Sequence, residues 1–364
     1  MRGTGAEPPG GSADAPEVVC LGESMVTFLP TRPGRLADVP AFLRGIGGAE
    51  SNVACALAGA GHRAAWVSRV GADGFGDHLV DTISGHGVDT SAVHRDPDRP
   101  TGVYFRTAAD RAEGAHEVAY YRAGSAASAM SPRNAPYDAL FAGRVLHLSG
   151  ITAALSDDCL ALLRTLTAER PRRPLISFDV NHRPRLWRGH PAGPGVLRDL
   201  ARGADVVFVG EDEAAEAWGV HGPEAIRAAL PEPSVLVVKR GAHGATVLAR
   251  PEGTPPGPGT DRATTAPALR VDVVAAVGAG DAFAAGFLSA TLRALPVRDR
   301  IRHGHLMAAA VLTVPGDLTR PPARAHADRL AALDDDAWRG VRLGPGWTSP
   351  TSGPVTPAAE GVPG

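Results

Sequence analysis

The hydrophobic positions of this chain form short runs, separated by segments in which apolar residues recur at helical spacing. The runs resemble buried strands in length and composition, and they lie at 18–21, 65–70, 145–148, 175–179, 206–209, 235–239 and 246–248. Helices are expected at 51–60, 74–86, 157–169, 212–217, 223–230, 281–294 and 301–312. Such alternation of strand and helix predicts an α/β fold, with a mostly parallel sheet covered by helices on both faces.

One region departs from this alternation. Residues 101–107 and 117–122 are extended segments rich in β-branched and aromatic side chains, and the polar loop between them predicts an antiparallel hairpin. The two-residue period of a strand places Tyr120 and Arg122 on one face of it. We expect this small sheet to act as a lid, because a small sheet outside the main fold can close over a site and exclude water from it.

The two ends of the chain show no apolar periodicity. Residues 1–16 and 345–364 are rich in Gly, Pro, Ser and Thr and are predicted to be disordered tails, which leaves one domain over about 17–335. The Pro-rich stretch 251–268 is interpreted as a surface loop of this domain, because the strand and helix pattern resumes directly after it.

The composition narrows the class of partner. With 364 residues and 44% apolar content, the chain can bury a large core. A formal net charge of -2 gives no general attraction to nucleic acid or to an anionic membrane, so the expected partner is a small molecule. No apolar run reaches the roughly 18 residues of a membrane span, and residues 1–16 lack the order of a signal peptide, so a cytoplasmic location is expected.

The cysteines predict neither a disulfide framework nor a zinc site. Cys20, Cys55 and Cys159 are odd in number, widely spaced and surrounded by apolar residues, which favours reduced thiols in the core.

The strongest local motif is the turn Gly278-Ala279-Gly280-Asp281, which joins an extended segment to a helix of small residues. Glycines allow backbone N–H groups to converge on an anion, and the positive end of the following helix points at the same place. Asp281 can then act as a base toward a substrate hydroxyl. It can equally be a plain helix cap, and the motif alone leaves both interpretations open.

Three other segments offer groups that bind polar ligands. GIGGAESN at 45–52 supplies backbone donors and the Asn52 amide, although Asn52 can also simply cap the next helix. FDVNHRPRLW at 178–187 follows a predicted strand, at the edge where open α/β sheets bind ligands. VVKRGAHG at 237–244 places the sole lysine, Lys239, before a glycine turn, where it can meet nucleotide phosphates or belong to an ordinary hairpin.

Taken together, GIGGAESNVA and VGAGDAFAAGF resemble the two signatures of the ribokinase-like (PfkB) carbohydrate kinase family, in the order and separation of that family. The segments GVYFR, AYYRAGSAAS, SGI and FDVNHRPRLW are similar to those of 2-keto-3-deoxygluconate kinases in particular. The resemblance covers about residues 18–325.

This resemblance implies a three-layer αβα sandwich with a mostly parallel central sheet. It also implies a small β-sheet lid, from about 38–47 and 101–122, that often forms a homodimer or a higher homo-oligomer. ATP with Mg²⁺ would be the phosphate donor, and a small sugar acid would be the acceptor.

The resemblance also assigns roles to individual residues. Asp281 would be the base, with Gly278, Ala279 and Gly280 as the anion hole and Arg183 as a bridge between substrate and phosphate. The substrate would be held by Gly48, Asn52, Tyr104, Tyr120, Arg122 and Asp317. The nucleotide side would be lined by Asn181, Lys239, Gly241 and Gly244. Arg122 and Arg183 also suit a sugar acid on chemical grounds, because arginine binds a carboxylate through paired donors.

Three departures from the family pattern concern ions and substrate. Ala275 and Ala276 replace the usual Asp-Thr, so a monovalent-cation site is not expected. Gly210 replaces the asparagine of the usual magnesium motif and leaves Glu213 as its remaining carboxylate, which would bind the metal through water. Thr27 stands where many relatives have an aspartate, a departure that sugar-acid kinases share.

The leading hypothesis is therefore transfer of the ATP γ-phosphate to 2-keto-3-deoxygluconate. A fructokinase or another hexose kinase is the alternative within the same class. A sugar-acid binding or sensor protein that has lost catalysis is the alternative outside it.

Overall fold

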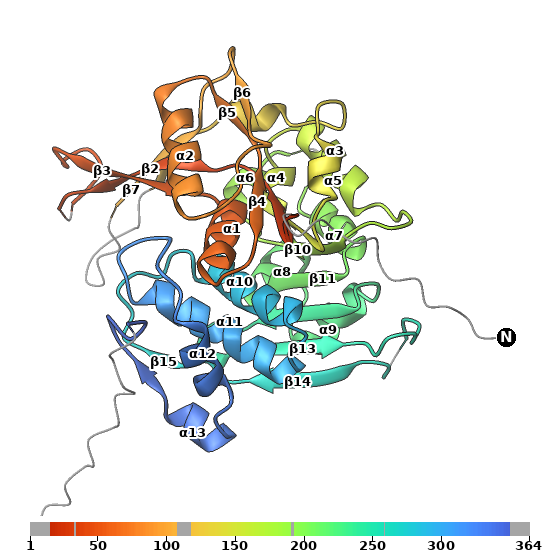
Figure 1. Cartoon of the computed structure of the whole chain (residues 1–364). Coiled ribbons are helices and arrows are strands. Elements are labelled where there is room, and N and C mark those ends of the chain that lie inside the picture. Colours follow the sequence, from red (N-terminus) through yellow and green to blue (C-terminus); the bar gives the residue numbers. More distant parts are fainter. Residues whose placement is uncertain (1–14, 33, 108–117, 191–192, 258, 350–364) are drawn as a thin grey trace, which may run out of the picture.

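The computed structural model describes residues 15–349 except 33, 108–117, 191–192 and 258 (Figure 1). Most of the two expected tails, 1–16 and 345–364, and the loop of the expected hairpin therefore lie outside the described residues. Within the described part, no helix is long and apolar enough to cross a membrane.

The centre of the molecule is an eight-stranded sheet in the order β14-β13-β12-β11-β10-β9-β1-β4 (Figure 1). Neighbouring strands from β4 through β12 run parallel, while β13 and β14 are antiparallel. Its strands are β1 (Val18–Leu21), β4 (Ala64–Val67), β9 (Val145–Ser149), β10 (Leu175–Asp179), β11 (Val206–Gly210), β12 (Val235–Lys239), β13 (Ala245–Ala249) and β14 (Arg262–Ala266). The predicted mostly parallel sheet is thus confirmed.

Successive side chains of each strand enter different cores, as the two-residue period of a strand requires. In β1, Val19 and Leu21 belong to one buried cluster, while Val18 and Cys20 belong to the cluster on the opposite face. Both faces of the sheet are covered, which explains why its strands read as nearly continuous apolar runs.

Helices form the two outer layers. The first face carries α3 (Tyr137–Leu140), α4 (Gly150–Ala153), α5 (Asp157–Thr167), α7 (Gly195–Arg202), α8 (Glu211–Trp218) and α9 (Pro223–Ala229). The second face carries α1 (Ala49–Gly59), α2 (Gly74–Gly85), α10 (Ala279–Leu292) and α11 (Val297–Leu312). A third, smaller core joins α11 to α12 (Arg324–Ala331) and α13 (Asp335–Gly340).

A separate four-stranded sheet in the order β3-β2-β7-β8 forms the lid, which projects to the left in Figure 1. Its strands are β2 (Met25–Pro30), β3 (Phe42–Gly47), β7 (Val103–Arg106) and β8 (Val118–Tyr121). β7 and β8 pair antiparallel, as the sequence predicted, with Tyr104 opposite Tyr120.

The remaining elements are short. They are β5 (Arg69–Gly71) with β6 (His94–Asp96), β15 (Arg270–Val271) with β16 (Arg342–Leu343), α6 (Pro184–Trp187), and the 3₁₀ turns η1 (Ala126–Ala129) and η2 (Gly241–His243). Cys20, Cys55 and Cys159 are buried free thiols.

Three boundaries differ from the sequence-based expectation. The apolar run 65–70 is divided between β4 of the main sheet and β5, which pairs with β6. The stretch 251–268, interpreted as a surface loop, contains the edge strand β14, which tolerates polar residues because most of its side chains are solvent-exposed. The packed chain also continues past 335 through α13 and β16 to Trp347, whose side chain is buried in the third core.

Candidate active site

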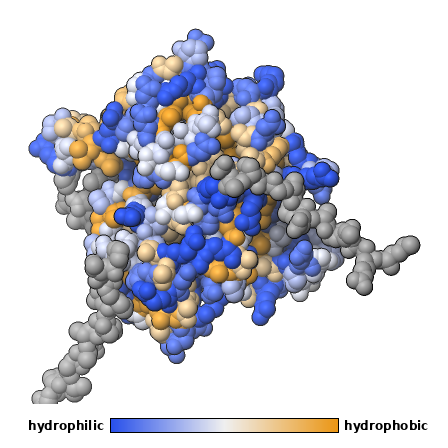
Figure 2. All heavy atoms as spheres, viewed as in Figure 1, coloured by the Kyte–Doolittle hydropathy of each residue, from blue (hydrophilic) through white to orange (hydrophobic). Residues whose placement is uncertain are grey.

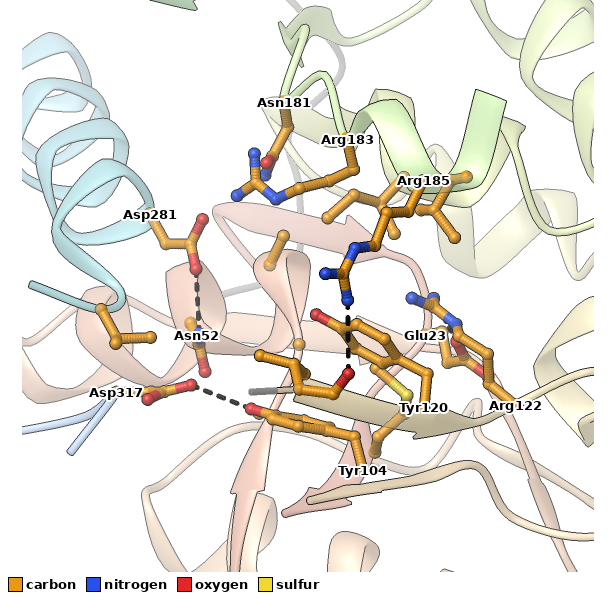
Figure 3. A pocket seen from close by; sticks show the side chains of 18 of the residues that line it. Glu23, Asn52, Tyr104, Tyr120, Arg122, Asn181, Arg183, Arg185, Asp281 and Asp317 are labelled. Carbon is orange, nitrogen blue, oxygen red and sulfur yellow. Dashed lines mark hydrogen bonds and ion pairs between the residues drawn. The ribbon is translucent and has the colours of Figure 1, made fainter. Parts of the chain in front are cut away.

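A cavity of about 530 Å³ lies between the lid and the carboxyl end of the main sheet (Figure 3). The residues that line it come from segments distant in sequence: the β1–β2 turn, the lid, the start of α1, Ile151 of α4, the segment after β10, the start of α10, and Asp317. Ligands of open α/β sheets bind outside the carboxyl ends of the strands, where this cavity lies.

The two glycine-rich segments of the sequence meet at this cavity. Gly48 and Asn52 of one segment and Gly278 and Asp281 of the other all line it. The Asn52 amide Nδ2 donates a hydrogen bond to Asp281 Oδ2 at 2.9 Å (Figure 3). Asn52 is therefore not merely a cap, since its side chain reaches a residue on another helix, and α1 is capped by Gly48 instead.

Asp281 lies in the first turn of α10 and accepts a hydrogen bond from the amide of Asn52. Among the described residues, no cationic side chain lies within ion-pair distance of its carboxylate; the nearby Lys239 pairs with Asp179. Desolvation by the surrounding protein raises the pKa of Asp281 to about 7, and the charge of Asp179 adds to this effect, although the Asn52 hydrogen bond lowers the pKa. A carboxyl group with such a pKa can exchange a proton near neutral pH.

The turn before Asp281 requires glycine at its first position. Gly278 has a φ of 74°, and a side chain there would collide with the backbone of Asp317. Ala282 N–H bonds to Gly278 O, whereas the N–H groups of residues 279–281 have no acceptor among the described residues. Free donors at the positive end of a helix suit a phosphate group.

Lys239 lies at the end of β12, next to this turn. Its Nζ is 3.6 Å from the position that a side chain on Gly280 would occupy, and it pairs with Asp179 at 3.0 Å. Burial alone would lower the pKa of Lys239, but the Asp179 carboxylate and others nearby raise it, so the ammonium stays charged. Gly241 and Gly244 form the turn after Lys239 with φ of 53° and 98°, and they do not line the cavity.

Residues after β10 form the upper wall of the cavity in Figure 3. Asn181 lines it with φ of 42°, and its buried Oδ1 has no hydrogen-bond partner. Arg183 also lines it and lies 3.6 Å from Glu213 Oε1, whose other oxygen accepts from Gly210 N–H at 2.8 Å. Glu213 therefore caps the start of α8 in this structure, and its role in binding a metal stays a prediction.

The lid supplies the lower wall of the cavity. Tyr104 and Tyr120 line it with ring centroids 5.4 Å apart, and the Tyr104 hydroxyl donates to Asp317 Oδ2 at 3.2 Å. Arg106 Nη2 donates to the other oxygen of Asp317 at 2.7 Å. Burial nevertheless raises the pKa of Asp317, even though the Arg106 charge and the Tyr104 hydrogen bond lower it.

Arg122 lines the cavity as the sequence predicted, but its charge is already balanced. It forms an ion pair with the carboxylate of Glu23, a buried residue that also accepts a hydrogen bond from the Ser125 hydroxyl. Both side chains of the pair are nearly buried, at 11% and 1% exposure, so neither charge is free to solvent.

Sequence reasoning missed Glu23 and Arg106 as cavity or support residues, and it assigned no individual role to Arg185. Glu23 follows β1 at the ligand-binding edge of the sheet, a position that could have identified it. Arg106 shares a lid face with Tyr104 by the two-residue period already applied to Tyr120. Arg185 lies in the FDVNHRPRLW segment that the sequence placed at this edge, and its guanidinium donates to the Val118 carbonyl of the lid, 3.4 Å away (Figure 3).

The comparisons with known proteins agree with this geometry. The model of the pfkB family carbohydrate kinases matches residues 15–324. The chain belongs to this family. As a pfkB kinase it is a carbohydrate kinase, a phosphotransferase with an alcohol group as acceptor.

Two curated members of the pfkB family illustrate the likeness. A 2-dehydro-3-deoxygluconokinase of Bacillus subtilis is 36% identical over 87% of this chain and 95% of its own length. A second 2-dehydro-3-deoxygluconokinase, of Thermoproteus tenax, is 33% identical over 86% and 93%. Plant fructokinases are also among the relatives, so the comparisons do not identify the sugar substrate.

The fold is that of the solved pfkB structures. A PfkB protein of Polaromonas superposes with a TM-score of 0.74 at 32% identity, covering 86% of this chain and 99% of the other. The ribokinase-like three-layer arrangement expected from the sequence is thereby confirmed.

We predict that the pair of Glu23 and Arg122 is a principal stabiliser of the lid side of the cavity. Glu23→Ala leaves a buried arginine without its counter-charge, so the free energy of unfolding should fall by about 3 kcal/mol or more in urea denaturation. The control Asp336→Ala removes a pair with Arg339 whose side chains are 97% and 58% exposed, and it should change stability by less than about 1 kcal/mol. Equal effects of the two variants would show that the buried pair contributes no special stability.

We also predict that ionised Asp281 destabilises the fold. The pKa of Asp281 in the fold is about 7, above the value near 3.9 of an unfolded chain. The protonated carboxyl therefore stabilises the fold at low pH, and this contribution is lost as the pH rises through 7. Asp281→Asn should therefore raise the melting temperature by a few degrees at pH 8 and by less at pH 5. Asp336→Asn is the exposed control and should show no such difference. A lower melting temperature of Asp281→Asn at pH 8 would contradict the prediction.

Proposed function

We propose that this kinase transfers the γ-phosphate of ATP to a hydroxyl of a small sugar acid, with 2-keto-3-deoxygluconate as the preferred acceptor. The observation that carries the proposal is the contact of Asn52 with Asp281, beside free N–H donors and below a wall of arginines. This arrangement joins a base, an anion-binding turn and cationic side chains in one cavity.

Asp281 is the base in this proposal. Ionised, it accepts the proton of the substrate hydroxyl, while the Asn52 amide holds the carboxylate oxygen at 2.9 Å and fixes its direction. Because the pKa of Asp281 is about 7, the carboxylate is present in a large fraction of molecules at neutral pH and still binds a proton well.

The residues beside Asp281 fit a phosphate donor. ATP held with Mg²⁺ would supply the phosphoryl group, and the free N–H groups of Ala279 and Gly280 would face the charge that develops on it. Lys239 lies next to the same turn, and Arg183 projects into the cavity from the segment after β10 (Figure 3). Positioning and charge stabilisation dominate phosphoryl transfer, and these groups provide both.

Asn181, Lys239, Gly241 and Gly244 form the nucleotide side of the proposal. The buried Oδ1 of Asn181 lacks a partner, and a ligand hydroxyl or amine could satisfy it. Glu213 is the proposed metal-side carboxylate, acting through water, which suits the reluctance of Mg²⁺ to lose its hydration shell.

The sugar side is polar on one wall and cationic on the other. Gly48, Asn52, Tyr104, Tyr120 and Asp317 offer the donors and acceptors that hydroxyl groups need. Arg183, Arg185 and Arg188 line the same cavity. Arg183 forms an ion pair with Glu213 at 3.6 Å, whereas Arg185 and Arg188 have no ion pair among the described residues. The two unpaired arginines favour a substrate that carries a carboxylate, which supports a sugar acid.

One observation favours a neutral hexose such as fructose. Arg122, proposed to bind the substrate carboxylate, is paired with Glu23 and offers less free charge than the sequence suggests. A fructokinase therefore remains the second candidate, and the acceptor must be decided by assay.

The deciding experiment is an assay of ADP release from ATP with purified protein and a panel of keto-deoxy sugar acids and hexoses. We expect the highest kcat/KM with 2-keto-3-deoxygluconate, and a loss of about 10²-fold to 10⁴-fold in kcat for Asp281→Asn. A higher kcat/KM with fructose would replace the sugar acid by the hexose. Calorimetric binding of the acid without ADP release would favour a binding protein, and near-normal turnover of Asp281→Asn would refute its role as base.

A homodimer formed through the lid is the second part of the proposal. The lid face away from the cavity carries an aromatic cluster in which Phe28 stacks on Phe105 at 4.7 Å and Tyr121 packs edge-on against Phe105. The exposed apolar residues lie on both faces of the lid: Tyr121, 66% exposed, on this face, and Leu43, 63% exposed, on the face that carries Tyr104. Figure 2 shows apolar atoms gathered on the projecting lid. Exposed apolar residues gathered on one projection are typical of protein interfaces, and a second lid would offer a matching apolar surface.

We predict that Leu43→Arg shifts the protein toward the monomer in size-exclusion chromatography with light scattering. Burying an arginine without a partner opposes association, so the monomer fraction should rise at micromolar concentration. The control Val274→Arg changes another exposed apolar residue, which lies outside the lid, and should leave the oligomer unchanged. A wild-type protein that is monomeric throughout would contradict this part of the proposal.

A further inference from the structure

A second cavity, of about 360 Å³, lies on the α11 side of the molecule and is separate from the candidate active site. It is enclosed by the end of α1, the later part of α10, α11, the loop 313–323 and α12. Its size falls within the range of small-molecule sites. No role for this cavity follows from the carbohydrate kinase reaction.

The lining of this cavity is basic. Arg293, Arg320 and Arg324 line it, together with His303, whose pKa is lowered by burial, and no aspartate or glutamate lines it among the described residues. The whole chain has a net charge of -2, so this local excess of positive charge is not a general property of the surface. A concave site lined by charge of one sign raises the local concentration of the opposite ion.

The arginines differ in what already binds them. Arg293 contacts both oxygens of Asp328 at 2.8 Å, which balances its charge. Arg324 donates to the backbone oxygen of Ala60 at 2.9 Å, a neutral acceptor. Arg320 is exposed, and no hydrogen bond or ion pair joins its side chain to the described residues. Two positive charges of the lining are therefore available to a ligand.

Other groups of the lining favour an anion with hydroxyl substituents. Thr348 lines the cavity and can bond to a polar ligand, and so does Ser289, whose hydroxyl is also hydrogen-bonded with His62 Nε2 at 2.8 Å. The positive end of α12 begins at Arg324, so the dipole of this helix adds to the side-chain charges. A phosphate ester of a small metabolite combines the charge and the hydroxyl groups that this lining would recognise.

The same loop connects this cavity to the active site. Asp317, which lines the substrate cavity, and Arg320, which lines the second cavity, are three residues apart. Pro321 contacts the end of α1 at Gly59, and a narrow void between the two cavities is lined by Asn52, Asp317 and Pro321. A ligand that moves this loop would therefore move a substrate-binding carboxylate.

We propose that the second cavity binds the phosphate group of a small phosphate ester through Arg320 and Arg324, and that this binding alters acceptor affinity through the loop that carries Asp317. The site lies outside the proposed catalytic machinery. The binding part does not depend on the identity of the sugar that the kinase phosphorylates.

The binding test uses isothermal titration calorimetry with the full chain. Glucose 6-phosphate is titrated in the presence of a saturating non-hydrolysable ATP analogue, which keeps the ester out of the nucleotide side of the active site. Inorganic phosphate and glucose are titrated in parallel. We expect binding of glucose 6-phosphate, weaker binding of phosphate and none of glucose.

Two matched variants locate the site. Arg320→Glu reverses the charge of a residue without described contacts, so it should leave the fold intact and weaken glucose 6-phosphate binding at least tenfold. Arg329→Glu makes the same change on the exposed part of α12 outside the cavity, and it should leave binding unchanged. Absence of binding to the wild type, or equal binding to Arg320→Glu, would overturn the site. Equal affinity for phosphate and for the ester would overturn recognition of the ester.

The coupling is tested separately by kinetics. Glucose 6-phosphate should change the KM for the acceptor in the wild type and in Arg329→Glu by severalfold, and should have no effect in Arg320→Glu. Binding at the cavity without any change of KM would overturn the coupling and leave the binding part standing. Absence of kinase activity would contradict the proposed function, but the calorimetric test of the second cavity would still be valid.

Discussion

The active site depends on the hydrogen bond between Asn52 and Asp281, which joins residues 229 positions apart. It forms because α1 and α10 pack on the same face of the sheet and begin at the same edge. Their small side chains allow the close approach: α1 is rich in alanine, and a side chain at Gly48 or Gly278 would collide with neighbouring backbone. The core packing of this face thus sets the distance between the Asp281 carboxylate and the Asn52 amide.

Electrostatic balance explains why Asp281, among the carboxylates around the cavity, is suited to proton transfer. Glu23 pairs with Arg122, Asp179 with Lys239, and Asp317 with Arg106. Asp281 has an amide as its partner, so the cost of desolvation appears in its pKa of about 7. The site therefore keeps one carboxylate free of a direct cation and ties the others to structural pairs.

Much of the fold could be predicted because strand and helix patterns depend on residues close in sequence. The alternation of apolar runs and helical periods identified seven strands of the main sheet, with the 65–70 run spanning β4 and β5. The β-branched segments identified the lid hairpin. The edge strand β14 was not predicted, because its polar side chains face solvent and it has no apolar run. The ion-pair partners of Arg122 and Asp317 were not predicted, because pairing between segments far apart in the chain leaves no periodic pattern in the sequence.

The sequence by itself determined the fold class and the chemistry-bearing segments, since strand and helix periods, glycine turns and the residues at strand ends depend on neighbours within a few positions. It also supplied Asp281, Asn52, Arg183 and Tyr104 as candidates. Only the tertiary structure decided which charges are already paired, how far the pKa of Asp281 rises and where a second basic cavity lies. These properties depend on burial and on contacts between segments far apart in the chain, which no local pattern encodes.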